Sequence, residues 1–378
     1  MAKPKLTFPT CQQPALVTHG TGAVRSLADA EMLRDGVWFV GGGDAVRALI
    51  AASLQRRGLD LPAERIVVKP PGEPAWPAIE QGAGRLRNLS PGRLIAVGGG
   101  AVLDWARLSV ARASGRLLPD GSMQESASGV PRPWTALVPT TCGSGAEASA
   151  VAVFSAEDGR KIPVVHRSFL ADLVVLDGRF LESVDDVTMA SSLADAISHA
   201  VEAYLSPVPN YLAKESAVSA LRLILRHAPA PRSPARNDRL MEAGYLAGVA
   251  ASNCSVGIVH AFAHSLARWG ARHGQANAIG LPSGLSINAH APAMGRLLEE
   301  LGLTSFDAFE ERLAALLRPA WHLAGAARQA LEAPVDRARL VEAILGDVCM
   351  RTNPVTLAEP EIEAFLDGVV RTLQQAES

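Results

Sequence analysis

The chain lacks the features that would tie it to a membrane, to nucleic acid or to an oxidising compartment. Its four cysteines, Cys11, Cys142, Cys254 and Cys349, have no paired spacing, which argues against a disulfide framework and against a thiolate zinc site. No run approaches the about 18 uninterrupted apolar residues that a membrane span needs, and the first residues lack the apolar core of a signal peptide. The net charge of -2 offers no basic field for nucleic acid or an anionic membrane. We therefore expect reduced cysteines, a cytoplasmic location and a small-molecule partner.

At 378 residues the chain exceeds the size at which one core usually stops growing, so two domains with a cleft between them are expected. The first half alternates short apolar runs with segments of helical spacing, among them 44–57 and 75–89. The apolar runs are bounded by Gly, Pro or charge, as buried parallel strands are. They are Val37–Val40, Arg65–Val68, Leu94–Val97, Thr135–Val138 and Leu173–Leu176. This pattern predicts an α/β domain over 1–180 with a doubly wound, mostly parallel sheet.

The β-branched runs end near Glu182, and long stretches rich in Ala and Leu follow, including 187–204, 211–227 and 237–251. These stretches predict an all-α domain over 181–378. The proline-rich segment 228–236 cannot continue a helix and is expected to be an exposed loop.

Several histidines and an aspartate of the second half share a spacing that suits a metal. Asp195 and His199 are four residues apart, which places both on one face of a helix, and His260 and His264 repeat that spacing before His273. A single buried histidine is usually a satisfied core residue. The whole set would leave several polar groups unsatisfied in apolar helices unless something binds them. A divalent cation would satisfy them together, and a carboxylate with imidazoles suits Fe(II), Zn, Co or Ni.

Two flexible segments follow strands of the first half. Gly98-Gly99-Gly100 stands between a strand and a helix, where backbone amides and the positive helix end can face a pyrophosphate, although glycine turns end many strands without binding anything. A second segment, 139–147, again follows a strand with hydroxyl and glycine residues. Open α/β sheets bind ligands at the carboxyl ends of their strands, so two such loops favour a dinucleotide site.

These motifs resemble the iron-containing alcohol dehydrogenase family over nearly the whole chain. Its Gly-Gly-Gly-Ser-x-x-Asp-x-Ala-Lys stretch is matched by 98–107, and its Pro-Thr-Thr-x-Gly-Thr-Gly-Ser-Glu stretch by 139–147. Its Asp-Ala-x-x-His-Ala-x-Glu-Ala-Tyr helix is matched by 195–204, and its His-x-x-x-His and His-Gly segments by His260, His264 and His273-Gly274. The resemblance implies the dinucleotide-binding and helical domains that the family shares with dehydroquinate synthase.

The resemblance also implies roles for individual residues. The metal ligands would be Asp195, His199, His260 and His273, and His264 would be the imidazole near the nicotinamide and the substrate. The cofactor would contact Gly98, Gly99, Gly100, Ala101, Asp104, Thr140, Thr141, Ser144 and Lys161. The expected metal is Fe(II), or Zn(II) or another divalent ion, and we also expect a homodimer.

The sequence departs from the family pattern in three places. Ala101 and Arg107 replace a Ser and a Lys, and the segment from His264 to His273 is one residue shorter than in familiar members, so the substrate pocket should differ. Arg268 and Arg272 lie in that segment. They could bind an anionic aldehyde, or they could simply be solvated on a helix face.

The implied activity is a metal-dependent alcohol dehydrogenase or aldehyde reductase, in which the metal polarises the substrate oxygen and His264 relays a proton. One alternative is a sugar-phosphate cyclase of the dehydroquinate synthase type, which would need a Lys and Arg cluster for its phosphate. Another is a non-catalytic relative that only binds ligands, although a complete ligand set argues against it.

Cofactor preference depends on the glycines that follow the strand Val37–Val40. Family members that prefer NAD commonly end this strand with an acidic residue that binds the adenosine ribose, whereas Gly41-Gly42-Gly43 stands here. Backbone amides without side chains could accommodate the phosphate of NADP, so NADP(H) is favoured over NAD(H). Asp44 is the opposing feature, because its carboxylate could bind the ribose or merely cap the next helix.

Overall fold

The computed structural model describes residues 10–41, 43–125 and 129–377, and their contacts divide into two compact units. An α/β unit comprises 14–185 and 227–245, and a helical unit comprises 10–13, 186–226 and 246–377. The predicted boundary between 180 and 181 stays a prediction. The segment 227–245 packs with the α/β unit partly because Asp238 accepts hydrogen bonds from the backbone amides of Thr21 and Gly178.

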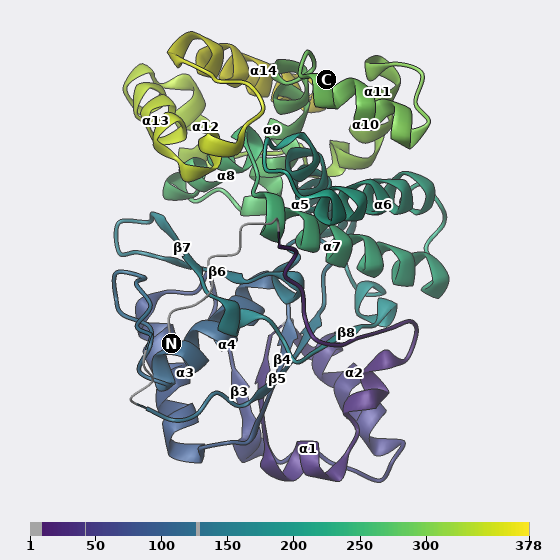
Figure 1. Cartoon of the computed structure of the whole chain (residues 1–378), viewed down its shortest axis with the longest axis vertical. Coiled ribbons are helices and arrows are strands. Elements are labelled where there is room, and N and C mark those ends of the chain that lie inside the picture. Colours follow the sequence, from purple (N-terminus) through teal and green to yellow (C-terminus); the bar gives the residue numbers. More distant parts are fainter. Residues whose placement is uncertain (1–9, 42, 126–128, 378) are drawn as a thin grey trace. The chain divides into compact units, whose positions relative to one another are not determined.

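The α/β unit is built on a parallel sheet in the order β1-β8-β5-β4-β2-β3 (Figure 1). The strands are β1 Val17–His19, β2 Gly36–Val40, β3 Ile66–Val68, β4 Arg93–Gly98, β5 Trp134–Pro139 and β8 Leu173–Leu176. A separate antiparallel hairpin is formed by β6 Val151–Ser155 and β7 Lys161–Val165. The helices are α1 Ala30–Asp35, α2 Gly43–Gln55, α3 Trp76–Leu89 and α4 Gly100–Ala113. All five predicted strands are present, and the doubly wound sheet is confirmed.

Both faces of this sheet are buried, which explains why its strands are continuously apolar. Trp38 and Val40 of β2 alternate onto one face and pack with α2 residues such as Ile50. Phe39 points to the other face, where its ring lies 4.5 Å from that of Trp105 in α4. Helices therefore cover the sheet on two sides, and α4 begins at the carboxyl end of β4.

The helical unit contains no strand within the residues that the structure describes, which confirms the predicted all-α second half. Its helices include α5 Asp186–Leu205, α6 Tyr211–His227, α8 Ile258–Leu266, α9 His273–Ile287, α10 Pro292–Leu301, α11 Phe306–Leu317, α12 Gly325–Glu332, α13 Pro334–Gly346 and α14 Glu359–Glu377. Helix α9 packs against α5, α8 and α14. Side chains at Gly280 and Gly284 would collide with Phe262 and Val259 of α8, so these glycines allow the two helices to approach closely.

The predicted loop over 228–236 is partly wrong, because α7, Pro234–Cys254, begins inside it. Ser233 accepts a hydrogen bond from the amide of Arg236, and Pro234 occupies the first turn, where its missing amide hydrogen costs no helical hydrogen bond. The Ser-Pro pair therefore starts a helix here, and the loop is confined to 228–233.

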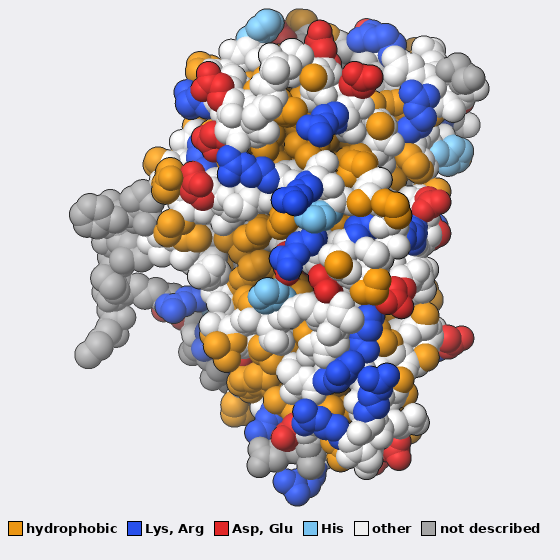
Figure 2. All heavy atoms as spheres, turned by 90° about the vertical axis from the view of Figure 1, so that its right-hand side faces the viewer, with side chains coloured by type: hydrophobic (Ala, Val, Ile, Leu, Met, Phe, Trp, Pro, Cys, Tyr) orange, Lys and Arg blue, Asp and Glu red, His pale blue; other side chains and the backbone are white. Residues whose placement is uncertain are grey.

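All four cysteines are free thiols, as expected. Taken one at a time, the described helices are too short or too polar to cross a membrane; only α7 combined with Ile258–Trp269, a pair bent by 97°, reaches the required length and composition. Side chains of both charges occur on the face drawn in Figure 2, in keeping with the net charge of -2.

Candidate active site

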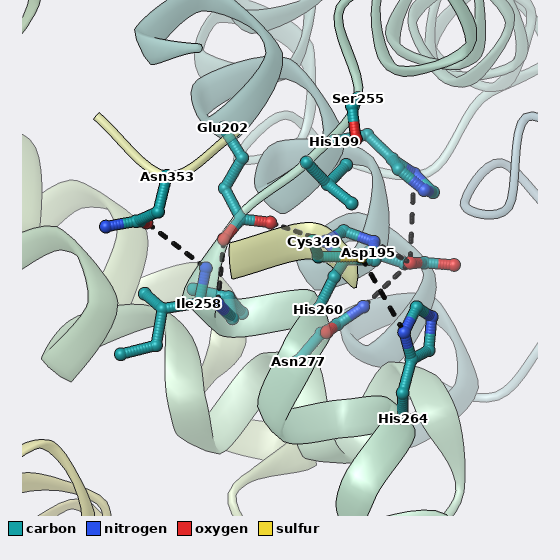
Figure 3. A network of polar contacts seen from close by, with 12 residues as sticks. Asp195, His199, Glu202, Ser255, Ile258, His260, His264, Asn277, Cys349 and Asn353 are labelled. Atoms are coloured by element: carbon teal, nitrogen blue, oxygen red, sulfur yellow. Dashed lines mark hydrogen bonds and ion pairs between the residues drawn. The ribbon is translucent and has the colours of Figure 1, made fainter. Parts of the chain in front are cut away.

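Helices α5, α8 and α9 bring together the aspartate and the three histidines that the sequence nominates as metal ligands. The Oδ1 atom of Asp195 lies 3.8 Å from His199 Nδ1, 3.6 Å from His260 Nε2 and 3.4 Å from His273 Nε2. The rings of His199 and His260 are 4.4 Å apart. Figure 3 shows the Asp195 carboxylate with His199 on one side and His260 close by. The ligand atoms of Asp195, His260 and His273 are near enough to one another to share one ion.

The spacing of each helix explains this convergence. Asp195 and His199 are one turn apart on α5, so their side chains leave the helix on the same face. His273 is the first residue of α9, and Gly274 follows it because a Cβ there would lie 2.7 Å from the backbone oxygen of Ser191 in α5. The His-Gly pair thus lets the first turn of α9 approach α5 closely and places the His273 ring beside Asp195.

Glu202 fixes the orientation of the His260 ring. Its Oε2 atom lies 2.5 Å from His260 Nδ1, and its Oε1 atom accepts a 2.7 Å hydrogen bond from the backbone amide of Val259. His260 Nδ1 therefore donates to the carboxylate, and Nε2 faces Asp195. Within the described chain His260 Nε2 is buried and has no hydrogen-bond partner. A buried nitrogen without a hydrogen bond, aimed at a carboxylate and two further imidazoles, is what a metal-binding site requires before the ion enters.

Asn277 stands one turn after His273 on α9. It donates a 2.8 Å hydrogen bond to Asp195 Oδ1, and its Nδ2 atom lies 3.3 Å from His273 Nε2. Asn277 is fully buried, so this amide holds the carboxylate in place from the side opposite His199 (Figure 3).

The electrostatics of this cluster favour a charged carboxylate. Burial raises the pKa of Asp195, but the imidazoles of His199 and His273 outweigh burial and hold that pKa well below its usual range. Burial lowers the pKa of His260, but the carboxylates of Asp195 and Glu202 outweigh it and raise the pKa to about 9. An ion bound to His260 Nε2 would have to displace a proton there.

His264 lies beside the cluster. Its ring stacks on that of His273 at a centroid distance of 5.4 Å, and its Nδ1 atom is 3.2 Å from Asp347 Oδ2 and 3.9 Å from Cys349 Sγ. Burial is the largest influence on His264 and lowers its pKa, against the opposing effect of Asp347. Asp347 is itself fixed, because its Oδ1 accepts the backbone amide of Cys349.

The two predicted cofactor loops are neighbours at one edge of the sheet in the α/β unit. Gly98 pairs with Pro139, and the Thr140 amide donates a 3.1 Å hydrogen bond to the Gly98 oxygen. A Cβ on Gly100 would lie 2.6 Å from Ser144 Oγ. Helix α4 begins at Gly100 without a side-chain cap. The Gly98–Gly100 backbone and the Thr140–Ser144 loop therefore form one surface beside an uncapped helix N-terminus.

Two other predicted cofactor residues, Asp104 and Lys161, have polar partners within the protein. Both oxygens of Asp104 are engaged, Oδ1 by Arg107 at 2.5 Å and Oδ2 by the Val153 amide at 3.0 Å. Lys161, on β7, pairs with Glu73 at 3.2 Å. Thr141 approaches Gly99, and Ala101 lies in the first turn of α4.

Of the glycines after β2, Gly42 lies outside the described residues. Gly41 has a packing role, because a Cβ there would lie 2.4 Å from Val102 Cγ2 in α4. Gly43 has a φ of +75°, which glycine adopts without strain. The side chain of Asp44 is 97% exposed and pairs with Arg47, one turn later in α2. In the segment before α9, Arg268 and Arg272 are exposed.

Comparison with known proteins places these observations in a family. Residues 14–178 match the model for "Iron-containing alcohol dehydrogenase", and 189–370 match that for "Fe-containing alcohol dehydrogenase family, C-terminal". The chain is 30% identical over 328 residues to "Probable alcohol dehydrogenase EutG" of Salmonella typhimurium, covering 83% of this chain and 81% of that protein. It is 26% identical over 342 residues to the "NAD-dependent methanol dehydrogenase" of Bacillus methanolicus, covering 85% and 87% of the two chains. An iron-containing alcohol dehydrogenase from Thermococcus thioreducens has the same fold, with a TM-score of 0.80 at 22% identity over 96% of this chain and all of that one.

Proposed function

This chain belongs to the iron-containing alcohol dehydrogenase family and is an oxidoreductase of alcohols and aldehydes, and from this premise we propose that it works with one divalent cation and a nicotinamide dinucleotide. The cyclase considered above loses its support, because the family models together match most of the chain. The set of four candidate ligands around Asp195 argues against the non-catalytic binder. The observation that carries the proposal is the convergence of three imidazoles on Asp195 Oδ1 within 3.8 Å.

The proposed ligands of the cation are Asp195, His199, His260 and His273. The donor set fits such an ion, because His260 Nε2 is buried, lacks a hydrogen bond within the described chain and faces a carboxylate. When bound, the cation would supply a Lewis acid that polarises the oxygen of the alcohol or aldehyde. Glu202 would hold His260 in the tautomer whose Nε2 lone pair faces the ion, and Asn277 would keep the Asp195 carboxylate oriented. The family name favours Fe(II), and the donor set also suits Zn(II), Co(II) or Ni(II).

The proposed dinucleotide site is the surface formed by Gly98–Gly100 and Thr140–Ser144. Glycines leave the backbone accessible there, and the uncapped start of α4 offers amide hydrogens to a pyrophosphate. When bound, the nicotinamide would supply or accept the hydride. Lys161 and Asp104 would support this site indirectly, without contacting the cofactor, because each already has a partner within the α/β unit.

NADP(H) preference also remains a proposal, resting on the absence of an acidic side chain at the end of β2. Gly41 supports this preference less than the sequence indicates, because packing against Val102 already requires a glycine there. The pairing of Asp44 with Arg47 in the first turn of α2 favours a helix-stabilising role for that carboxylate over ribose binding. The relative named for its NAD dependence is the opposing observation.

His264 is proposed as the proton-relay group. With Nδ1 held by Asp347, Nε2 is the nitrogen left to exchange a proton with the substrate oxygen or with water. Burial keeps the ring neutral near pH 7, so that it can accept a proton.

A homodimer is proposed as well. Strand β1 lies at one edge of the sheet, and Leu16 and Val17 there are 63% and 37% exposed. An apolar sheet edge of this kind can be covered by a second copy of the chain. Light scattering on the purified protein would test this, and a monomer would refute it.

The experiment that tests the catalytic proposal is an aldehyde panel with NADH and NADPH after reconstitution with Fe(II) or Zn(II). His260→Ala should lower the metal content and abolish turnover, while circular dichroism stays close to that of the unchanged protein. His290→Ala, which removes an exposed histidine of the same unit, is the matched control. Near-unchanged turnover by His260→Ala after exhaustive chelation would refute a metal-dependent mechanism.

A further inference from the structure

A small pocket, of about 170 Å³, lies in the α/β unit on the side where the strands begin. Its walls come from the second half of α4, from the start of β5 and from the 3-10 turn Arg167–Phe169 before β8. The residues that line it are Arg107, Val110, Ala111, Ser114, Arg116, Arg132, Thr135, Ser168 and Phe169. No aspartate or glutamate is among these lining residues.

This pocket is separate from the proposed dinucleotide site. Thr135 lines the pocket near the first residue of β5, whereas Thr140 follows its last residue. An extended strand rises about 3.3 Å per residue, so the two positions are roughly 16 Å apart. The pocket is also smaller than the about 300 Å³ at which sites for drug-sized ligands begin, so a dinucleotide would not fit.

Arg107 provides the first observation that points to a ligand. It is only 2% exposed, its Nη1 donates to the Ser149 oxygen at 2.6 Å, and its Nη2 donates to Asp104 and to the Val151 oxygen. The third nitrogen, Nε, is buried and has no hydrogen-bond partner in the part of the chain that is described. The guanidinium lies 5.8 Å from the ring centroid of Phe169, which lines the same pocket. A buried charged donor without an acceptor is costly, so an acceptor in the pocket would be stabilising.

The other two arginines differ in how they are engaged. Arg132 is fully used within the protein, because it donates to Asp172 at 2.8 Å and to the oxygens of Ser168 and Leu170. The side chain of Arg116 has no hydrogen-bond or ion-pair partner among the described residues, whereas its backbone bonds to Ala111 and Gln124. Asp104 pairs with Arg107 and Asp172 pairs with Arg132, and the buried carboxyl of Glu147 also interacts with Arg107. Arg116 is the arginine of this pocket whose side chain has no ion pair among the described residues.

We propose that this pocket binds a small oxyanion, of the size of inorganic phosphate, between Arg116 and the Nε of Arg107. One oxygen would accept the buried Nε hydrogen, and the remaining oxygens would face the Arg116 guanidinium, whose fork suits phosphate. Such an anion would connect the end of α4 to the turn before β8, so its binding should stabilise the α/β unit. This proposal does not depend on the identity of the metal or of the nicotinamide cofactor.

The test is a titration of the full chain with inorganic phosphate in chloride buffer at constant ionic strength, followed by thermal unfolding and by calorimetry. The unchanged protein should show a saturable rise in Tm, because a ligand bound only to the folded state stabilises it. Arg116→Gln should weaken phosphate binding about tenfold or more, as expected when a charge-assisted hydrogen bond is lost. Ala111→Leu, which fills the pocket and keeps every charge, should abolish binding. Arg85→Gln, at an exposed position of α3, is the control and should bind as the unchanged protein does.

Two further measurements test whether the rise in Tm comes from phosphate bound in this pocket. Saturating NADH or NADPH should leave the phosphate effect in place, and acetate should bind more weakly than phosphate. The proposal is overturned if the Tm rise is absent, if it persists in both Arg116→Gln and Ala111→Leu, if the dinucleotide competes it away, or if acetate binds more tightly. Should Arg116→Gln fail to fold, Ala111→Leu decides alone.

Discussion

Substitution of Glu147 by glutamine is expected to stabilise the protein at pH 8.5 and to change its stability little at pH 5. Glu147 ends the segment 139–147 and is 3% exposed, and its Oε2 atom has no hydrogen-bond partner within the described residues. Burial raises its pKa from 4.5 to about 7, against the lowering effect of Arg107, while Asp104 raises it further. The folded protein therefore resists ionisation of this carboxyl.

The sign and size follow from linkage. Below pH 4.5 the carboxyl is protonated in both the folded and the unfolded chain, so the raised pKa has no cost there. As the pH rises through about 7, the unfolded chain has already lost its proton, and stability falls until the folded state ionises too. The interval from 4.5 to about 7, at about 1.4 kcal/mol per pH unit, sets an upper limit of ~3 kcal/mol above pH 7. Glutamine is uncharged at every pH and removes this loss.

The assay is urea unfolding followed by tryptophan fluorescence at pH 5 and at pH 8.5, with Tm measured in parallel. We expect Glu147→Gln to gain ~1–3 kcal/mol at pH 8.5, equivalent to about 2–4 °C for each kcal/mol. Glu157→Gln is the matched control, because it makes the same chemical change at an exposed position of the β6–β7 turn. Equal effects of Glu147→Gln at the two pH values would refute the reasoning, as would a loss of stability at pH 8.5.

Three further predictions concern the proposed chemistry. His264→Ala should slow turnover while metal content stays near that of the unchanged enzyme; metal loss as complete as in His260→Ala would instead make His264 a ligand. Asp347→Asn should lower kcat about tenfold and shift the pH profile without removing metal, because it weakens the hold on the His264 Nδ1 atom; an unchanged pH profile would count against a positioning role. The ratio of kcat/KM values should favour NADPH over NADH with one aldehyde, and a preference for NADH that Asp44→Ala abolishes would assign cofactor choice to that carboxylate.

The sequence predicts the sheet well because its central strands are buried on both faces and are therefore apolar throughout. Strand β1 was missed because it is short and partly exposed, so it lacks such a run. The β6–β7 hairpin was missed because Pro163 interrupts its second strand, in which only Val164 is buried. The packing of 227–245 with the α/β unit depends on tertiary hydrogen bonds of Asp238, which no local pattern shows.

In the candidate site, too, local spacing could be predicted from the sequence, whereas tertiary contacts could not. The pairing of Asp195 with His199 could be predicted, since a spacing of four residues fixes a shared helix face. Glu202 and Asn277 carried a weaker signal of the same kind, because each stands on the ligand-bearing face of its helix, and neither was nominated. Asp347 carried no signal, because it meets His264 only through the packing of two helices that are distant in the sequence.

Asp104 is a residue of a predicted cofactor motif whose carboxylate is engaged within the protein. The sequence places it in the cofactor loop, yet its carboxylate joins α4 to the β6–β7 hairpin through Arg107 and the Val153 amide. The family's lysine at position 107 would carry the same charge on one ammonium, whereas arginine has a planar fork that reaches Ser149, Val151 and Asp104 together. Arginine also has a third nitrogen, Nε, which is buried and has no hydrogen-bond partner among the described residues. The Lys-to-Arg departure therefore preserves the link to Asp104 and adds a donor to a residue that lines the proposed oxyanion pocket.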